Sequence, residues 1–172
     1  MTGVYVAAGS NVRPRENLSR ALGELGRSFP GLRASPAYQN AAVGFEGEDF
    51  INLVVGFDTN LDLPAVVDEL RRIESLCGRG RDAPKWAPRS MDLDILLFGD
   101  LVGSFPDATL PRPDLLKRPY MLGPLADIAP DITHPALHRR IGDLWADFDR
   151  GAHKLRPVVL ESVLGPGGDA PR

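Results

Sequence analysis

The chain has 172 residues, which suits one domain of ordinary size and is short for two. Hydrophobic residues make up 43% and charged residues 25%, so the composition argues against disorder along the whole chain. The net charge of −3 argues against nucleic-acid binding through bulk positive charge, and no apolar run approaches the roughly 18 residues of a membrane span. The single cysteine, Cys77, excludes an internal disulfide, and the N-terminus lacks a signal-peptide pattern, so we expect a cytoplasmic protein.

Apolar periodicity and turn residues predict six elements in the first part of the chain. The helical stretches repeat apolar residues at i, i+3, i+4 and i+7, and the strands are rich in alternating apolar residues. Pro36 is expected to kink the second strand, and Pro64 suits the first turn of the second helix. In chain order we predict a strand over 4–8, a helix over 16–29, a strand over 32–39, a strand over 50–59, a helix from 62 to 77 and a strand over 91–98.

This order predicts an α+β domain with a ferredoxin-like βαββαβ core, in which helices pack on a mainly antiparallel sheet. Extra C-terminal helices follow the core, and the domain is expected to span residues 1–164. Downstream of the core we predict irregular chain over 101–113, one or two short helices over 115–128, a helix over 140–148, a strand within 155–164 and a flexible tail over 165–172.

Two acids, Asp92 and Asp94, lie two residues apart in the strand predicted over 91–98. Side chains at this spacing point to one face of a strand, so the carboxylates share a face while Leu93, Ile95 and Leu97 line the other. Neighbouring carboxylates repel each other, and a cation between them relieves that repulsion. Oxygen ligands suit Mg²⁺, which is commonly held by one or two carboxylates and substrate phosphates. A solvated strand face with two acids is the alternative interpretation.

Basic residues flank the acid pair on both sides. They are Arg79, Arg81, Lys85 and Arg89 before it, and Arg112, Lys117 and Arg118 after it. Guanidinium groups match phosphate oxygens two at a time. A metal-binding acid pair beside several arginines is typical of a polyphosphate site, and an ordinary mixed-charge surface is the alternative.

Aromatic residues near these charges suggest a planar ligand. Trp86 lies between basic residues in a predicted loop, which is typical of a lid but also of a tryptophan folded onto the core. Phe50 and Asn52 share one face of the strand over 50–59, where a flat ring and an amide that donates and accepts would suit a heteroaromatic ring. From these two residues alone, a core aromatic beside an edge amide is the simpler interpretation.

The segment from Arg79 to Gly99 resembles the signature of the 6-hydroxymethyl-7,8-dihydropterin pyrophosphokinase family of folate synthesis. Its most specific part reads Trp86-Ala87-Pro88-Arg89-Ser90-Met91-Asp92-Leu93-Asp94-Ile95-Leu96-Leu97-Phe98-Gly99. Residues 5–11, 49–52 and 118–125 also agree with the family, and the resemblance covers roughly residues 4–148.

This resemblance implies a Mg²⁺-dependent enzyme that transfers diphosphate from ATP to the hydroxymethyl group of the reduced pterin and releases AMP. It implies two Mg²⁺ ions held at Asp92 and Asp94, with Arg79 and Arg89 beside them in the catalytic set. The ATP site implied in this way comprises Arg71, Glu74, Arg79, Arg81, Trp86, Arg89, Ile95, Arg112 and Arg118.

The same resemblance implies that the pterin ring lies between Phe50 and Tyr120. The other positions of the pterin site are Asn40, Ala41, Val43, Asn52 and Trp86. The loops over 10–13, 44–49 and 79–89 would close over the bound substrates, and we expect a monomer whose partners are ATP and the pterin.

Several positions depart from the family's common pattern. Phe50 stands where Tyr is common and Tyr120 where Phe is common, and both exchanges keep an aromatic sandwich. Asn40-Ala41 replaces a frequent Ser or Thr followed by Pro, Arg112 replaces a frequent His, and Arg71 replaces a frequent Gln. These three departures favour a rival hypothesis, a nucleotide-binding module without catalysis. A second rival is a nucleotidyltransferase that leaves AMP on its acceptor, because an Asp-x-Asp pair on a strand of a ferredoxin-like sheet also suits that chemistry.

Overall fold

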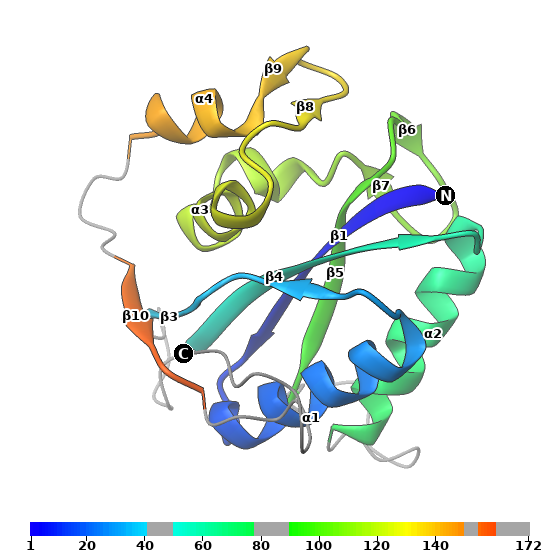
Figure 1. Cartoon of the computed structure of the whole chain (residues 1–172), viewed down its shortest axis with the longest axis vertical. Helices are drawn as coiled ribbons and strands as arrows, with labels where there is room; N and C mark the ends of the chain where they lie inside the picture. The colour runs from blue at the N-terminus through cyan, green and yellow to red at the C-terminus, as the bar shows by residue number, and fades with distance from the viewer. Residues whose placement is uncertain (41–49, 78–89, 150–154, 161–172) are drawn as a thin grey trace.

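The centre of the structure is a six-stranded sheet in which every described strand pair is antiparallel (Figure 1). The computed structural model describes residues 1–40, 50–77, 90–149 and 155–160. The main strand order is β10-β3-β4-β1-β5, and β2 also pairs with β4. The strands are β1 (Thr2–Ser10), β2 (Arg33–Ala34), β3 (Ala37–Asn40), β4 (Phe50–Thr59), β5 (Asp92–Phe98) and β10 (Arg156–Val158). The mainly antiparallel sheet is therefore confirmed.

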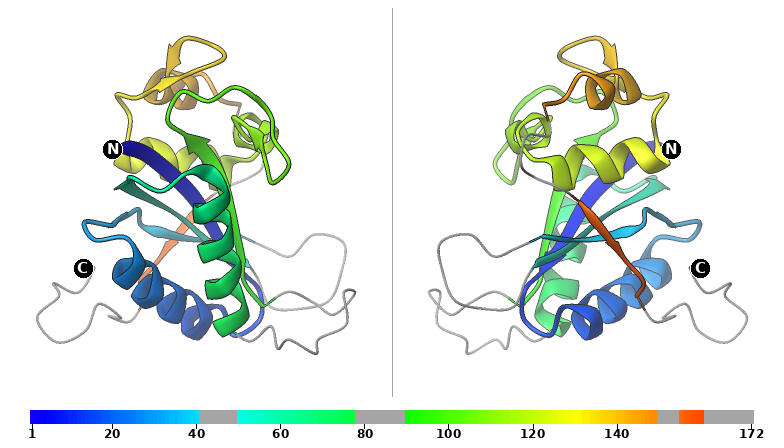
Figure 2. Two further views of the ribbon diagram at one scale, coloured as in Figure 1. Left: turned by 90° about the vertical axis from the view of Figure 1, so that its right-hand side faces the viewer. Right: turned by 90° about the vertical axis from the view of Figure 1, so that its left-hand side faces the viewer.

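Helices cover the sheet from both sides (Figure 2). On one side lie α1 (Pro14–Ser28) and α2 (Leu63–Leu76), and on the other lie η1 (Pro113–Leu116), α3 (Pro119–Ile128) and α4 (Ile141–Ala146). Helix α1 begins two residues before the predicted start, because Pro14 suits the first helical turn. Helix α2 begins after Asp62, whose side chain accepts a hydrogen bond from the Ala65 N–H at 3.0 Å.

The larger core lies between the sheet and the α1–α2 layer. The alternating residues of β4 are buried there as predicted, and Phe57 stacks on Phe29, which directly follows α1, with ring centroids 3.9 Å apart. Cys77 is fully buried in the same core, and burial raises the pKa of its thiol. This cysteine is therefore a small core residue, as expected from its place on the apolar stripe of the helix.

The smaller core lies on the opposite face, under α3. Met121, Leu122 and Leu125 pack there against Val54 of β4 and Leu96 of β5. The prediction that Leu97 faces the same way as Leu93 and Ile95 is wrong. A register shift between β1 and β5, at Tyr5 and Val6, interrupts the alternation, so that Leu97 joins the smaller core.

The predicted strand over 32–39 is divided into β2 and β3 at Ser35 and Pro36. The Ser35 N–H donates to the Val54 carbonyl at 2.8 Å, and the Ser35 hydroxyl accepts from the Val54 N–H at 2.9 Å. The Ser35 hydroxyl therefore replaces a backbone carbonyl as the acceptor for the Val54 N–H. The chain bends at the next residue, Pro36, which has no N–H to donate.

Residues 101–113 were predicted to be irregular, and this prediction is wrong. They contain a hairpin of β6 (Gly103–Ser104) and β7 (Thr109–Leu110), closed by hydrogen bonds between Phe105 and Ala108 at 2.8 and 3.3 Å. A second hairpin, β8 (Thr133–His134) with β9 (Arg139–Arg140), was not predicted. The region over 115–128 holds two helices, η1 and α3, and 155–164 contains β10. Residues 165–172 lie outside the described residues.

Among the described residues, no helix is both long enough and apolar enough to cross a membrane.

Candidate active site

The acid pair lies where the sheet register brings three strands together. Gly9 of β1 pairs with Asp92 of β5 on one side and with Asn52 of β4 on the other. Asp94 pairs with Ala7, two residues before Gly9 in β1. The side chains of Asn52, Asp92 and Asp94 therefore belong to the face of the sheet opposite α1 and α2.

A cavity of about 240 Å³ occupies this part of the sheet face. Small residues of β1 form its floor, and the rings of Phe50 and Tyr120 come from the start of β4 and the start of α3. Its polar atoms come from the acid pair and from two amides, where Asn52 Nδ2 donates to Asn40 Oδ1 at 2.5 Å. The lining residues are Ala7, Ala8, Gly9, Asn40, Phe50, Asn52, Asp92, Asp94, Tyr120 and Met121.

Gly9 is required at the floor of this cavity by the position of Asn52. A Cβ atom at residue 9 would lie 2.4 Å from Asn52 Oδ1 and 3.5 Å from its Cγ. The absence of a side chain at Gly9 therefore lets the Asn52 amide oxygen approach β1 closely, at the wall of the cavity.

A second cavity of about 280 Å³ adjoins the first, and Asp94 lines both. Its wall combines two turns of α2 with β5 and with the segment that follows β6. Both signs of charge are present, from Arg71 and Arg112 and from Glu74, Asp94 and Asp107. The remaining lining residues are Val67, Leu70, Leu93, Ile95 and Ala108.

Buried hydrogen bonds fix the start of β5, which carries the acid pair. The Glu74 carboxylate of α2 accepts from the Leu93 N–H at 2.9 Å, and Glu74 is only 9% exposed. The Ser90 hydroxyl donates to the Cys77 carbonyl at 2.5 Å, and the Ser10 hydroxyl donates to the Ser90 carbonyl. The ends of α2 and β1 therefore hold β5 in place, which limits how far its carboxylates move.

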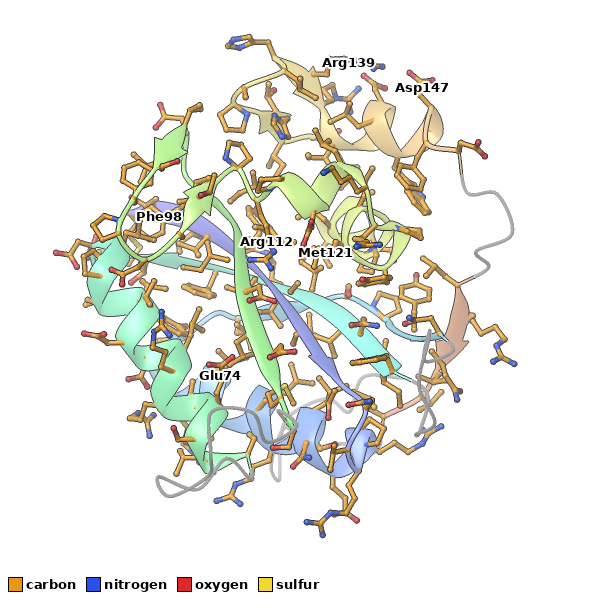
Figure 3. All side chains as sticks on the ribbon, turned by 180° about the vertical axis from the view of Figure 1, so that it is seen from behind. Glu74, Phe98, Arg112, Met121, Arg139 and Asp147 are labelled. Carbon is orange, nitrogen blue, oxygen red and sulfur yellow. The ribbon has the colours of Figure 1, made fainter. Side chains whose placement is uncertain are left out.

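Arg112 lies beside β5, and Glu74 lies on α2 (Figure 3). One guanidinium nitrogen of Arg112 is 3.7 Å from the Asp94 carboxylate, and another is 3.7 Å from that of Asp114. Its Nε is buried and has no hydrogen-bond partner among the described residues. The side chains of Arg112 and Asp94 are each 33% exposed, so the pair is open to solvent and to ligands.

The structure brings most of the predicted site residues together around the two cavities. Arg118, the residue before α3, lines neither cavity. Six predicted site residues lie outside the described residues: Ala41, Val43, Arg79, Arg81, Trp86 and Arg89. The predicted loops over 44–49 and 79–89 lie outside them too.

Sequence reasoning missed several residues that line the cavities. Ala7, Ala8 and Met121 carry no chemical signal, and Val67 and Leu70 were assigned to the apolar stripe of a helix. Asp107 follows β6, in a segment predicted to be irregular. Gly9 had a usable signal, because a glycine directly before a polar turn indicates close approach of another group.

The acid pair suits a hard cation that also binds a substrate. Among the described residues, no group of three or more His, Cys, Asp or Glu side chains could hold a metal ion. Two carboxylates on one face are the usual protein contribution to a Mg²⁺ site whose other ligands are water and phosphate oxygens. The residues present therefore fit a metal ion carried with a polyphosphate.

The fold and these cavities define an α+β protein with two adjoining cavities, one lined by aromatic rings and amides and the other by arginines and acids. Residues 5–130 match the family model described as 7,8-dihydro-6-hydroxymethylpterin-pyrophosphokinase (HPPK). The chain therefore belongs to the HPPK family.

Two curated relatives carry the name 2-amino-4-hydroxy-6-hydroxymethyldihydropteridine pyrophosphokinase. The one from Pseudomonas aeruginosa is 42% identical over 137 residues, which cover 77% of this chain and 83% of the relative. The one from Synechocystis is 35% identical over 166 residues, which cover 95% of this chain and 84% of the relative.

A solved structure with the same fold is wild-type Plasmodium falciparum HPPK-DHPS with SDX-DHP. The TM-score is 0.65 at 15% sequence identity, and the match covers 86% of this chain and 44% of that one. The chain thus spans less than half the length of that protein, and the likeness concerns the fold.

Proposed function

We propose that this chain transfers diphosphate from ATP to the hydroxymethyl group of 6-hydroxymethyl-7,8-dihydropterin, giving AMP and the pterin diphosphate. The observation that carries the proposal is the meeting of two cavities at Asp94, one with aromatic and amide groups and one with arginines. Family membership supports the same activity, because the relatives are named for it. The pterin that accepts the diphosphate and the ATP that donates it would lie on either side of Asp94, so they would react without leaving the site.

The pterin ring is proposed to bind in the first cavity, between Phe50 and Tyr120. Aromatic rings at its walls would stack on a planar heterocycle. Asn52 and Asn40 would pair with the donors and acceptors on the edge of the pterin, because an amide offers both kinds of group. Ala41, Val43 and Trp86 complete this proposed site by resemblance to the family.

ATP is proposed to bind in the second cavity. Ile95, Val67 and Leu70 offer apolar surface to the base, while Arg71 and Glu74 lie beside it. Arg112 lies close enough to Asp94 to contact phosphates that approach the acid pair. The proposed phosphate-binding set also includes Arg79, Arg81, Arg89 and Arg118, with Trp86 over the site.

Asp92 and Asp94 are proposed to hold two Mg²⁺ ions together with the ATP phosphates. Such ions neutralise charge on the transferred group and orient it. The protein's part is positional: β5, fixed by Glu74 and Ser90, presents both carboxylates toward the cavity that holds the acceptor. The hydroxymethyl oxygen would form its bond to the β-phosphorus and lose its proton to solvent. On the opposite side, the bond from the β-phosphorus to the bridging oxygen would break, and that oxygen would leave with AMP.

We propose that the core is ferredoxin-like, formed by β1, α1, β3, β4, α2 and β5. The order β3-β4-β1-β5 with antiparallel neighbours supports this, because it is the order that two split βαβ units generate. A single domain over 1–164 with a tail over 165–172, and a monomer, are proposed too. A cytoplasmic location is supported by the single buried cysteine.

The decisive experiment is mass analysis of the products from ATP, Mg²⁺ and the reduced pterin alcohol. We expect AMP and the pterin diphosphate in equal amounts. AMP attached to the pterin would instead identify a nucleotidyltransferase, and binding of ATP without turnover would identify a module without catalysis.

The same assay with Asp94→Ala tests the acid pair. Loss of the metal ligand should lower kcat/KM on the order of a thousandfold, because several kcal/mol of charge stabilisation is lost. Asp100→Ala, which changes an exposed acid of the turn after β5, is the matched control and should retain wild-type turnover. Wild-type activity of Asp94→Ala would refute the metal assignment.

A further inference from the structure

The backbone of Arg112 makes a normal hydrogen bond to β5, whereas its side chain makes only long ion pairs within the described part of the chain. Its N–H donates to the Leu96 carbonyl of β5 at 3.0 Å, which fixes the residue at the edge of the second cavity. The guanidinium, in contrast, reaches Asp94 and Asp114 only at 3.7 Å, longer than an N–H···O hydrogen bond of about 2.9 Å. The side chain can therefore reorient while the chain around it stays in place.

The hydrogen-bonding capacity of this guanidinium is poorly used among the described residues. A guanidinium has five N–H donors. Here it has two long ion pairs, and its buried Nε has no hydrogen-bond partner among those residues. A buried donor without a partner costs free energy, so added oxygen acceptors would stabilise this side chain. Phosphate oxygens suit it best, because they accept from an arginine fork two at a time.

Asp94 is the point where this arginine and a metal ion would compete. The carboxylate lies 3.7 Å from Arg112 Nη1 and also lines the cavity with Asp92. In the substrate-free chain the guanidinium offsets part of the repulsion between the two acids. A divalent cation at Asp94 would repel the guanidinium and displace it from that carboxylate.

We propose that Arg112 is a substrate-binding residue with two states: it pairs with Asp94 in the substrate-free chain and moves to the nucleotide phosphates when a divalent cation takes that carboxylate. This inference rests on the proposed function, which assigns the metal to Asp94 and the nucleotide to the second cavity. Asp114, which lies 3.7 Å from the other terminal guanidinium nitrogen, would keep the side chain near the site as it moves. The metal ion and the nucleotide would thus each favour the binding of the other, in addition to the direct coordination of the metal by the phosphates.

The test uses two titrations of the full chain and of Arg112→Ala. In the first, Mn²⁺ alone is titrated by calorimetry, and the variant should bind it about three- to tenfold more tightly, because no guanidinium competes for Asp94. In the second, α,β-methylene-ATP is titrated at saturating Mn²⁺, and the variant should bind it about three- to tenfold more weakly, because a phosphate contact is lost. A purely structural ion pair would not move these two affinities in opposite directions.

Arg139→Ala is the matched control, because it removes an exposed positive charge of β9 that lines neither cavity. It should change neither affinity, since a solvated charge outside the cavities is screened by salt. If Arg139→Ala tightened Mn²⁺ binding as much as Arg112→Ala does, the first effect would come from net charge alone, and the pairing with Asp94 would be overturned. Arg112→Ala with unchanged analogue affinity would overturn the phosphate contact.

Asp94→Ala separates this inference from the proposed function. If Asp94→Ala binds Mn²⁺ as the wild type does, the metal assignment itself fails. If Asp94→Ala loses Mn²⁺ binding while Arg112→Ala behaves like the wild type in both titrations, the proposed function stands and the role of Arg112 is refuted.

Discussion

The two faces of the sheet differ in how completely helices cover them. On the α1–α2 face, alternate residues of β1, β4 and β5 are apolar and buried along most of each strand. On the other face, α3 covers Val54 and Leu96, while Gly9, Asn52 and the acid pair beyond them line a cavity. The same strands serve both faces because their side chains alternate. Substitutions on one face should therefore affect stability, and those on the other should affect catalysis.

The largest effect on stability is expected on the fully covered face. Phe57→Ala removes a ring that stacks on Phe29 and is completely buried. The free energy of unfolding should fall by about 4 kcal/mol, from lost burial and the cavity left behind. Chemical denaturation measures this fall. Asp94→Asn, on the other face, should change it by less than about 1 kcal/mol, because this side chain is a third exposed. Similar losses in both variants would contradict the division between the faces.

A smaller, purely functional effect is expected from Gly9→Ala. The new Cβ atom would lie 2.4 Å from Asn52 Oδ1, the movable end of a side chain, so the fold is retained while the amide is displaced. The KM for the pterin should rise about tenfold or more, because the amide no longer meets its edge. The affinity for α,β-methylene-ATP should stay at the wild-type value, since Gly9 does not line the second cavity.

Gly26→Ala is the matched control for this prediction. A Cβ atom at residue 26 of α1 would meet nothing within 4 Å. The change should raise the free energy of unfolding by about 1 kcal/mol, since alanine is the better helix former, and leave both KM values unchanged. An unchanged pterin KM in Gly9→Ala would mean that Asn52 does not contact the pterin.

The sequence predicted the covered face better than the face that carries the site. Alternation over 50–59 and the helical repeat over 16–29 identify core residues because burial imposes one simple rule on every position. This periodicity fails to predict the structure where a strand is interrupted or shifted in register. The hydroxyl of Ser35 replaces a ladder contact, and the register shift beside Tyr5 moves Leu97 to the other face. Such exceptions depend on a neighbouring strand, which one segment of sequence does not contain.

The site shows the same division between local and long-range information. Asp92 and Asp94 could be predicted from the sequence because both lie in one strand, where residues two apart share a face. The packing of Asn52 over Gly9 and the contact of Arg112 with Asp94 join residues far apart in the chain. They follow from strand register and from the path of the chain after β6, where the hairpin of β6 and β7 was itself missed. The family resemblance supplied most of the remaining residues.

The smallest effect is expected outside both cavities, at the hairpin of β8 and β9. His134 is buried there, and its Nδ1 accepts from the N–H groups of Ala136 and Leu137 at 3.2 and 3.1 Å. Burial lowers the pKa of His134 below its usual value of 6.5. The unfolded chain therefore binds more protons than the folded chain just below that pH, and the stabilisation present above it is lost as the pH falls.

Replacing His134 by Asn tests this linkage, because the Asn side chain keeps an oxygen acceptor and does not titrate near neutral pH. We expect the free energy of unfolding of the wild type to fall between pH 7 and 5 by up to about 1 kcal/mol more than that of His134→Asn. Chemical denaturation across this pH range measures the difference. The pH profile of kcat/KM should be the same in both proteins, since His134 lines neither cavity. Parallel stability curves would refute the linkage, and a shifted activity profile would show that this hairpin acts on the site.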